Sequence, residues 1–265
     1  MKISIITATY NSAATVRDTL ESILRQSWQD WEVIIKDGGS HDETLPLCRE
    51  YAERAGGRIR IISCPDKGIY DAMNQGIAAA TGDVVGLLNS DDMYYDDRVL
   101  ERIAAAMTED EGLGCVFANL LMVDAKDTDR VLRVWRGSPY RKKAFRKGWH
   151  PAHPTFYARR QLFEELGGFD TDFAVSADFE LMLRFLEKNG VPSRWLPYYF
   201  VKMRSGGEST GSLRNIVRGN RNILRAFTKN GFSRPPFYLV KRLAPKVWAV
   251  LKAKLGVRPE ALNND

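Results

Sequence analysis

The chain has 265 residues, 44% of them hydrophobic and 27% charged, a composition ordinary for a globular protein with one large domain or one domain and an appendage. Its three scattered cysteines lack metal-binding or redox spacing, which favours a reducing compartment. No stretch approaches the ~20 apolar residues of a membrane span, and the start lacks a signal-peptide pattern. We therefore expect a cytoplasmic protein. The net charge of +6 is uneven, because residues 201–265 carry 14 Lys and Arg against 3 Asp and Glu, and such a basic end favours an anionic partner.

A strand, a turn and a helix open the chain. Residues 3–7 form an apolar run that predicts a buried strand, and apolar side chains then recur at helical spacing over 16–24. The polar residues 8–12 connect the two elements. Backbone N–H groups at a helix start favour phosphate, so this turn is a candidate anion site, with a plain connection as the alternative.

A second unit follows, with a polar turn after its strand. Residues 31–36 predict the strand, and Asp37 stands directly after it. Ser40 through Glu43 fits a capping box for the next helix. A carboxylate at Asp37 can accept hydrogen bonds from a base or a ribose, and a turn-forming aspartate is the equally open alternative.

The next elements continue this alternation. Residues 58–62 predict a third strand and residues 84–88 a buried strand, and a helix is predicted between them over 69–80. The resulting order β-α-β-α-β-α-β predicts a parallel sheet with right-handed crossovers. Ligands of such sheets bind beyond the carboxyl ends of the strands.

Two adjacent carboxylates, Asp91 and Asp92, follow the apolar run at 84–88. Oxygen ligands of this kind suit a divalent cation, which in turn suits a diphosphate. A solvated Asp-Asp turn or a helix cap before Asp96 is the alternative, since acidic residues are favoured at helix starts.

Four motifs together resemble those of family 2 glycosyltransferases. They are Thr7-Ala8-Thr9-Tyr10-Asn11, Asp37-Gly38-Gly39-Ser40-His41-Asp42-Glu43-Thr44, the segment from Asp66 to Gly76, and Asn89-Ser90-Asp91-Asp92. The resemblance covers at least residues 1–190, in order and at plausible spacing. It implies an α/β fold called GT-A, a Rossmann-like, nucleotide-sugar-binding mixed sheet flanked by helices, here with a C-terminal helical appendage.

The resemblance also implies roles for individual residues. The nucleotide would be bound by Thr7, Ala8, Tyr10, Asn11, Asp37 on the pyrimidine, Asp66 and Lys67 beside the base, Asn74 supporting the same pocket, and Asp91 near the ribose. Asp92 would hold a divalent metal, Mn²⁺ or Mg²⁺, which fits ligation by oxygen. The family often has Asp where this chain has Asn89.

Beyond the acid pair, we expect a hairpin and then a basic loop. A helix is predicted around 99–107, and strands at 114–123 and 131–135 flank a polar turn. Residues 140–149 mix five basic side chains with three aromatic ones. This stretch is either a solvated loop or a flap over the acceptor.

The segment 150–157 contains two of the three histidines in the chain. A zinc site would need further ligands at suitable spacing, and none is evident. The segment resembles the family's histidine-containing strand near the acceptor site, and His153 is the closer match. A histidine bonded into the core is the alternative.

A helix predicted from Ser176 through Leu186 begins with two acids, Asp178 and Glu180. The family's catalytic carboxylate lies in an acid pair at this point, where the chain has Ala177-Asp178. The resemblance therefore implies that Asp178 is the general base, with Glu180 as the fallback and a tentative acceptor residue. A helix-capping role for Asp178 is the alternative.

The last part of the chain is basic, and we assign residues 1–210 to the GT-A domain and 211–265 to a helical region. Residues 205–209 resemble a glycine loop that lies beside the diphosphate in the family, and Arg204 is a candidate for serving the leaving group. Residues 235–255 combine recurring apolar side chains with Lys and Arg. This pattern favours an interfacial helix on an anionic membrane, or a helix packed on the enzyme body.

We therefore expect an inverting, metal-dependent glycosyltransferase. Its donor would be a nucleotide sugar, with UDP favoured over GDP, and its acceptor a glycan or lipid-linked hydroxyl in surface polysaccharide synthesis at the inner face of the plasma membrane. Nucleic acid is not expected as a partner, because no base-reading module is present. The alternatives are a sugar-nucleotide nucleotidyltransferase and a non-catalytic binding protein with a basic tail.

Overall fold

The computed structural model describes residues 1–206, 213–240 and 242 of the chain. Its centre is a nine-stranded mixed sheet with the order β3-β2-β1-β4-β8-β6-β9-β5, and β7 pairs with β6. The strands are β1 Ile3–Thr9, β2 Trp31–Asp37, β3 Ile59–Ser63, β4 Val84–Leu87, β5 Met93–Tyr94, β6 Cys115–Val123, β7 Val131–Trp135, β8 Tyr157–Arg159 and β9 Ser193–Arg204. The four strands β1 to β4 are parallel, as the alternating sequence order predicts.

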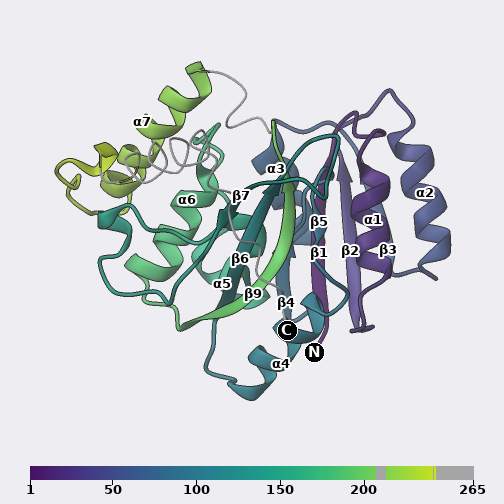
Figure 1. Cartoon of the computed structure of the whole chain (residues 1–265), viewed down its shortest axis with the longest axis horizontal. Coiled ribbons are helices and arrows are strands. Elements are labelled where there is room, and N and C mark those ends of the chain that lie inside the picture. Colours follow the sequence, from purple (N-terminus) through teal and green to yellow (C-terminus); the bar gives the residue numbers. More distant parts are fainter. Residues whose placement is uncertain (207–212, 241, 243–265) are drawn as a thin grey trace.

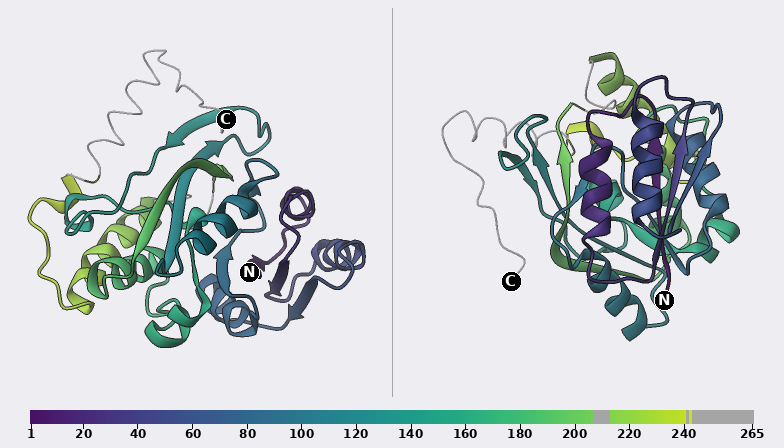
Figure 2. Two further views of the ribbon diagram at one scale, coloured as in Figure 1. Left: turned by 90° about the horizontal axis from the view of Figure 1, so that it is seen from below. Right: turned by 90° about the vertical axis from the view of Figure 1, so that its right-hand side faces the viewer.

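Helices cover both faces of the sheet (Figure 1). They are α1 Val16–Leu24, α2 Thr44–Arg54, α3 Ile69–Ala79, α4 Val99–Glu109, α5 Arg160–Leu166, α6 Ala177–Met182 and α7 Leu213–Lys229. Successive strand side chains point to opposite faces, so Ile5 packs with α1, α2 and α4, whereas Ile6 packs with the core of α3, α6 and α7. In the right-hand view of Figure 2, α1 and α2 lie side by side in front of the sheet.

The second half of the sheet is antiparallel in part. The predicted hairpin is present, because β6 and β7 pair in antiparallel register from Leu120–Trp135 to Val123–Val131. Strand β9 was not expected from the sequence; it pairs in parallel with β6 and in antiparallel fashion with β5. This long strand carries Arg204 back to the acid pair after β4, because Arg204 is its last residue.

Two local expectations were wrong. The predicted capping box at the start of α2 is not formed; Asp42 instead accepts hydrogen bonds from the backbone N–H and hydroxyl of Thr44. His153 lies in a short 3-10 turn, His153–Thr155, before β8 and not on a strand. The helix predicted through Leu186 is present, as α6 continued by a wider π-helical turn, Leu183–Lys188.

The described part of the C-terminal region packs on the sheet-bearing body. Phe227 of α7 and Tyr238 contact each other and the ring of Phe179 on α6, and all three are buried. The first residues of the predicted interfacial helix are thus partly fixed to the body, while 243–255 lie outside the described residues. The division at residue 210 stays a prediction. No helix within the described ranges is long and apolar enough to cross a bilayer.

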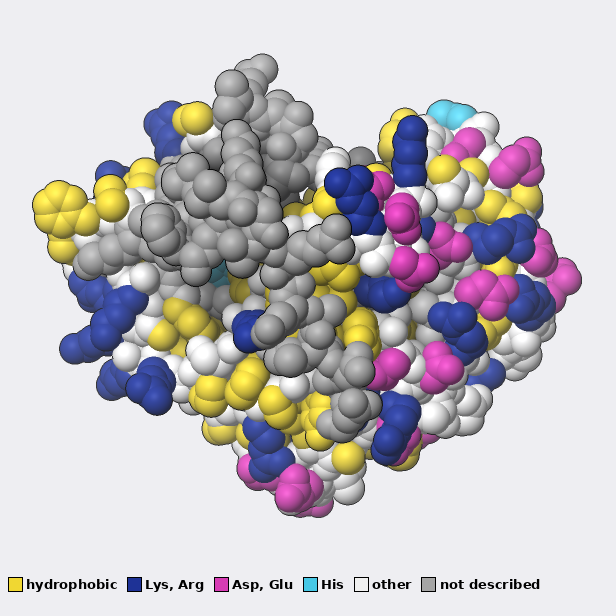
Figure 3. Space-filling model, in the orientation of Figure 1, with side chains coloured by type: hydrophobic (Ala, Val, Ile, Leu, Met, Phe, Trp, Pro, Cys, Tyr) yellow, Lys and Arg dark blue, Asp and Glu magenta, His cyan; other side chains and the backbone are white. Residues whose placement is uncertain are grey.

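Charge is unevenly distributed over the surface in Figure 3. Acidic and basic side chains mix on the right of this face, where α1 and α2 lie, whereas the left side, towards α7, shows basic side chains without acidic neighbours. The excess of basic residues in the C-terminal part of the sequence therefore corresponds to a basic side of this face.

Candidate active site

A cleft of about 420 Å³ opens at the carboxyl ends of β1 and β4. This is the edge where the sequence analysis placed a ligand, since the parallel strands end there together. The predicted site residues among its lining are Ala8, Asn11, Asp91, Asp92 and His153. The cleft also contains Tyr70 and Arg204, which come from α3 and β9.

The two acids of the pair differ in exposure. Asp92 is only 1% exposed; its carboxylate accepts hydrogen bonds from the Asn89 amide (3.2 Å) and the Arg204 backbone N–H (3.2 Å). Burial and then the charge of Asp91 raise the pKa of Asp92 well above its usual value. Asp91 is half-buried, and burial likewise raises its pKa, against the opposing effect of Arg204. Asp91 is therefore the more accessible carboxylate, which differs from the expectation that Asp92 is the metal-facing one.

The donor set at the pair fits a hard divalent cation. Two carboxylates adjoin Asn89, whose amide oxygen is buried and has no hydrogen-bond partner among the described residues. No group of three or more His, Cys, Asp or Glu side chains suited to a metal occurs within the described ranges. A cation held here would thus take its remaining ligands from water and substrate oxygens, as Mg²⁺ does in phosphate sites.

Asp37 is saturated by protein donors. Its carboxylate accepts hydrogen bonds from the hydroxyls of Thr9, Ser40 and Ser63 and from the N–H groups of Gly39 and Ser40. Burial opposes ionisation, but the hydrogen bonds, with Ser40 foremost, outweigh it and hold the pKa of Asp37 below its usual value. The side chain is fully buried and organises the turn, which matches the turn-forming alternative for this residue.

A second group of predicted nucleotide residues lies beside this turn. The Tyr10 ring, 61% exposed, and the Asp66 carboxylate both lie against Gly38, where a Cβ atom would be 3.6 Å from the ring and 2.7 Å from Asp66 Oδ2. The buried ammonium group of Lys36 holds Asp66 in place. It donates hydrogen bonds to the Asp66 carboxylate (3.1 Å) and to the carbonyls of Asp37 and Cys64. An exposed aromatic ring can stack on a nucleobase. The neighbouring Asp66 carboxylate, with 16% of its side chain exposed, can accept a hydrogen bond from the base.

Three other predicted nucleotide residues do not line the cleft. Thr7 is fully buried in β1, and Lys67 is exposed in the turn before α3. Asn74 faces away from the proposed pocket, since its amide bonds both the N–H (2.7 Å) and the carbonyl (2.8 Å) of Phe169. The expected support of the base by Asn74 is therefore wrong for this geometry; Asn74 holds the turn before α6.

Asp178 lies just behind the cleft wall. Its carboxylate contacts His153 Nδ1 (3.3 Å) and accepts a hydrogen bond from the Tyr70 hydroxyl (3.3 Å). His153 and Tyr70 both line the cleft, and His153 also lines a small hollow that contains Asp178. Burial, followed by the charge of Asp178, raises the pKa of Tyr70, so this phenol stays a proton donor to the carboxylate.

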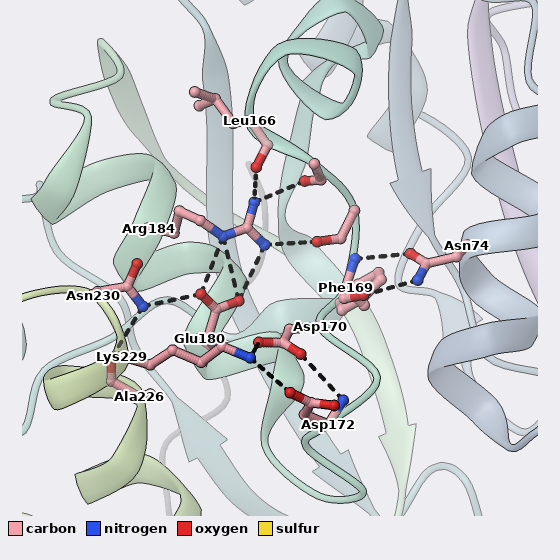
Figure 4. Close-up of polar contacts among 12 residues, drawn as sticks. Asn74, Leu166, Phe169, Asp170, Asp172, Glu180, Arg184, Ala226, Lys229 and Asn230 are labelled. Carbon is pink, nitrogen blue, oxygen red and sulfur yellow. Dashed lines mark hydrogen bonds and ion pairs between the residues drawn. The ribbon is translucent and has the colours of Figure 1, made fainter.

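Glu180 is not available to an acceptor. It is 3% exposed, and Figure 4 shows its carboxylate between Arg184 (3.0 Å) and the Asn230 amide (2.9 Å). The same Arg184 guanidinium donates to the carbonyls of Leu166, Gly167 and Gly168. The tentative acceptor and fallback base roles of Glu180 are therefore wrong; the residue joins α6 to α7 and to the 166–168 turn.

Removal of Glu180 is expected to destabilise the protein strongly. Glu180→Ala leaves the Arg184 charge buried without its carboxylate, which typically lowers the free energy of unfolding by about 3–5 kcal/mol. Urea denaturation followed by circular dichroism measures this loss. The matched control is Glu164→Ala, which breaks an exposed pair with Arg160 at the same i,i+4 spacing and should cost about 0–1 kcal/mol. Equal losses in the two variants would contradict the structural role.

Sequence reasoning overlooks Lys36 and Tyr70. A lysine inside the apolar strand 31–36 is the available signal for the first, because lysine is almost never fully buried unless paired. Tyr70 gives no such signal, since its contact with Asp178 joins residues 108 positions apart. The glycine loop at 205–209 is described only as far as Gly206, which lines the cleft.

Comparison with known proteins agrees with this geometry. The family model described as glycosyl transferase family 2 matches residues 4–175. A PGL/p-HBAD biosynthesis glycosyltransferase of Mycobacterium tuberculosis is 33% identical over 221 residues, which span 81% of this chain and 80% of that protein. The putative glycosyltransferase EpsE of Bacillus subtilis is 30% identical over 190 residues, 71% of this chain and 67% of that protein.

Solved structures share the fold. Residues 1–349 of S. aureus TarS superpose with a TM-score of 0.66 at 18% identity, covering 97% of this chain and 76% of that one. A mannosyltransferase from Pyrobaculum calidifontis, solved with GDP-Man and Mn²⁺, gives 0.63 at 21% identity, covering 96% and 73%. TarS has also been solved with UDP-GlcNAc. The curled mixed sheet flanked by helices is thus the GT-A fold.

Proposed function

The chain belongs to glycosyl transferase family 2, and we propose that it transfers a sugar from a nucleotide diphosphate donor, UDP in the first instance, to a hydroxyl group with inversion at the anomeric carbon. The observation that carries this proposal is a single cleft. It is lined by the acid pair after β4 and by His153, which contacts the Asp178 carboxylate. The family membership weighs against a nucleotidyltransferase and a silent binding protein.

On the donor side, Asn11, Tyr10 and Asp66 are proposed to bind the nucleoside. Tyr10 offers its exposed ring for stacking, and the Asp66 carboxylate, held by Lys36, offers a hydrogen-bond acceptor. Thr7 would support this pocket from within β1, and Asp37 would shape the turn after β2, whereas Asn74 holds the turn before α6. Lys67 is exposed beside it and can contact a phosphate or the base edge.

A divalent cation, Mn²⁺ or Mg²⁺, would be held by Asp91, with Asp92 and the Asn89 amide oxygen beside it. Such a cation supplies charge neutralisation for the departing diphosphate. Arg204 adds a permanent positive charge beside the acid pair. Its guanidinium donates a hydrogen bond to the Asp91 carbonyl (2.9 Å) and pairs with Asp18. The oxygen-rich donor set supports this assignment, and the Mn²⁺-bound neighbour agrees with it.

On the acceptor side, Asp178 is proposed as the general base. The acceptor oxygen forms a bond to the anomeric carbon, the bond from that carbon to the diphosphate breaks, and the hydroxyl proton passes to Asp178. His153 lies between Asp178 and the cleft, so it can contact the acceptor and hand on the proton. Tyr70 orients the carboxylate from the other side.

The acceptor is proposed to be a glycan or a lipid-linked molecule in surface polysaccharide or glycolipid synthesis. One curated relative is named for PGL/p-HBAD biosynthesis, and this name agrees with a transfer reaction in a biosynthetic pathway. A soluble donor and a lipid-linked acceptor would meet at the inner face of the plasma membrane, which is where we place the enzyme.

A thermal-shift screen of nucleotide sugars with and without Mn²⁺ tests the donor proposal. A true donor at about 100 times its Kd should stabilise the protein by about 2.7 kcal/mol, because it binds only the native state. We expect UDP-sugars to raise the melting temperature more than GDP-sugars, and Mn²⁺ to increase the shift. A response to a nucleoside triphosphate and sugar phosphate, with pyrophosphate release, would contradict a transferase and favour a nucleotidyltransferase.

A further inference from the structure

A basic segment, residues 141–147, stands outside the proposed site. It carries Arg141, Lys142, Lys143, Arg146 and Lys147 and no acidic residue. None of these side chains forms an ion pair with an acid in the parts of the chain that are described; Arg146 donates to the Ser233 hydroxyl (2.9 Å). Ion pairs with the described residues therefore do not neutralise the side-chain charges of the basic segment.

The basic segment is held in place and is not a free flap. Glu187 accepts hydrogen bonds from the Lys143 backbone N–H (2.8 Å) and the Tyr140 hydroxyl (2.8 Å). Phe145 is fully buried and packs edge-on against Trp149 and Phe179, with ring centroids 5.5 Å apart in both pairs. The buried ring and the anchored backbone present the cations on a fixed surface.

Exposed apolar side chains lie next to the basic segment. The Arg146–Ser233 bond and the close approach of Gly148 to the Arg242 backbone, 3.1 Å from a Cβ at Gly148, place residues 233–242 beside it. Phe237 is 78% and Val240 64% exposed, whereas Tyr238 between them is 1% exposed. The buried tyrosine fixes this stretch on the body, and Phe237 and Val240 are thus exposed side chains on a stretch that lies beside the basic segment.

We propose that the basic segment, together with Phe237 and Val240, docks on an anionic lipid surface. Basic side chains bind acidic headgroups, and projecting aromatic and aliphatic side chains insert at the level of the acyl boundary. Figure 3 shows no acidic side chains on this side of the face, so the surface complements a negative one. An anionic membrane uses both features, whereas a nucleic acid backbone uses the charge alone.

The C-terminal residues 243–265 do not supply a complementary negative charge. Residues 243–265 carry four basic and two acidic side chains, so their net charge has the same sign as that of the basic segment. The proposal is independent of the transfer reaction, because lipid binding is measured without donor or acceptor. It differs from the interfacial helix expected over 235–255 in naming a surface on the folded body.

Vesicle co-sedimentation of three full-length double variants with equal charge change tests the proposal. The vesicles are phosphatidylcholine with or without phosphatidylglycerol, at low salt. Lys142→Glu with Lys147→Glu should weaken partitioning onto the anionic vesicles by at least about 30-fold, the loss expected for two basic side chains at such a surface. The matched control, Arg49→Glu with Lys126→Glu, changes exposed residues elsewhere and should lose far less. Melting curves verify that each variant is folded.

The third double variant, Lys252→Glu with Lys254→Glu, separates the basic segment from the tail. The proposal would be overturned if only this variant lost binding while Lys142→Glu/Lys147→Glu bound the vesicles as the parent does. It would also be overturned if the control, Arg49→Glu/Lys126→Glu, lost as much binding as Lys142→Glu/Lys147→Glu. Absence of parent binding to anionic vesicles, with binding to a DNA duplex instead, would also overturn it. Phe237→Ser should weaken binding further, and undiminished binding would remove Phe237 from the docking surface.

Discussion

Asp178→Asn is expected to lower kcat by a factor of about 10² to 10⁴, the usual contribution of a general base. The asparagine has nearly the same shape and can still accept the Tyr70 hydrogen bond, but it cannot take the proton of the acceptor hydroxyl. Donor affinity should be unchanged, because Asp178 is not part of the lining shared by Asn11 and the acid pair. Turnover with a UDP-sugar and calorimetric UDP binding measure the two quantities separately.

The control for this prediction is Asp172→Asn, which removes an exposed carboxylate six residues earlier that pairs with Lys229 (2.9 Å). Its kcat should stay close to that of the parent. The base assignment would fail if Glu180→Gln were inactive at full stability while Asp178→Asn remained active. His153→Ala should share part of the loss if the imidazole passes the proton to Asp178.

Asp91→Asn is expected to abolish the Mn²⁺-dependent part of UDP binding and lower UDP affinity in Mn²⁺ by at least about tenfold, since the cation no longer bridges protein and diphosphate. The melting temperature without ligand should change little, because the Asp91 side chain is half-buried and no described side chain donates a hydrogen bond to it. Isothermal calorimetry of UDP with and without Mn²⁺, together with melting curves, tests both statements.

Asp92→Asn should behave differently and serves as the comparison. Its buried carboxylate accepts bonds from both Asn89 and the Arg204 backbone, so an amide there presents an N–H group to one of these donors and lowers stability. Loss of the Mn²⁺ effect in Asp92→Asn at unchanged melting temperature, with the effect intact in Asp91→Asn, would restore the original assignment of the metal to Asp92. Asp129→Asn controls for the charge change, at an acid that is 92% exposed and pairs with Lys202 at the surface.

Much of the parallel half of the fold follows from the sequence, because three of its four strands are mainly apolar runs. Residues 3–7, 31–36 and 84–88 therefore predict strands that are neighbours in the sheet. β9 could not be found in this way. Its buried and exposed positions do not alternate, and its partners β5 and β6 are reached only through tertiary packing.

The candidate site shows the same division between local and distant information. The turn residues after β1 and β4 were expected at one edge, and Asn11, Asp91 and Asp92 do line one cleft. The partners of each polar side chain were not predictable, since they depend on residues far away in the chain. Asp37 and Asn74 are saturated by protein groups for this reason.

The two hydrogen bonds between the Asn74 amide and the Phe169 backbone limit how segments of this chain can be exchanged with those of other family members. Asn74 bonds only the backbone of residue 169, so these two hydrogen bonds do not depend on the side chain at that position. The neighbouring position is restricted, because a Cβ at Gly168 would lie 2.3 Å from the Asn74 amide oxygen. A chimera that takes its second half from another family member therefore has to inherit asparagine at 74 and glycine at 168 as a pair. The side chain at 169 is restricted separately, because Phe169 is buried and stacks on the Tyr70 ring.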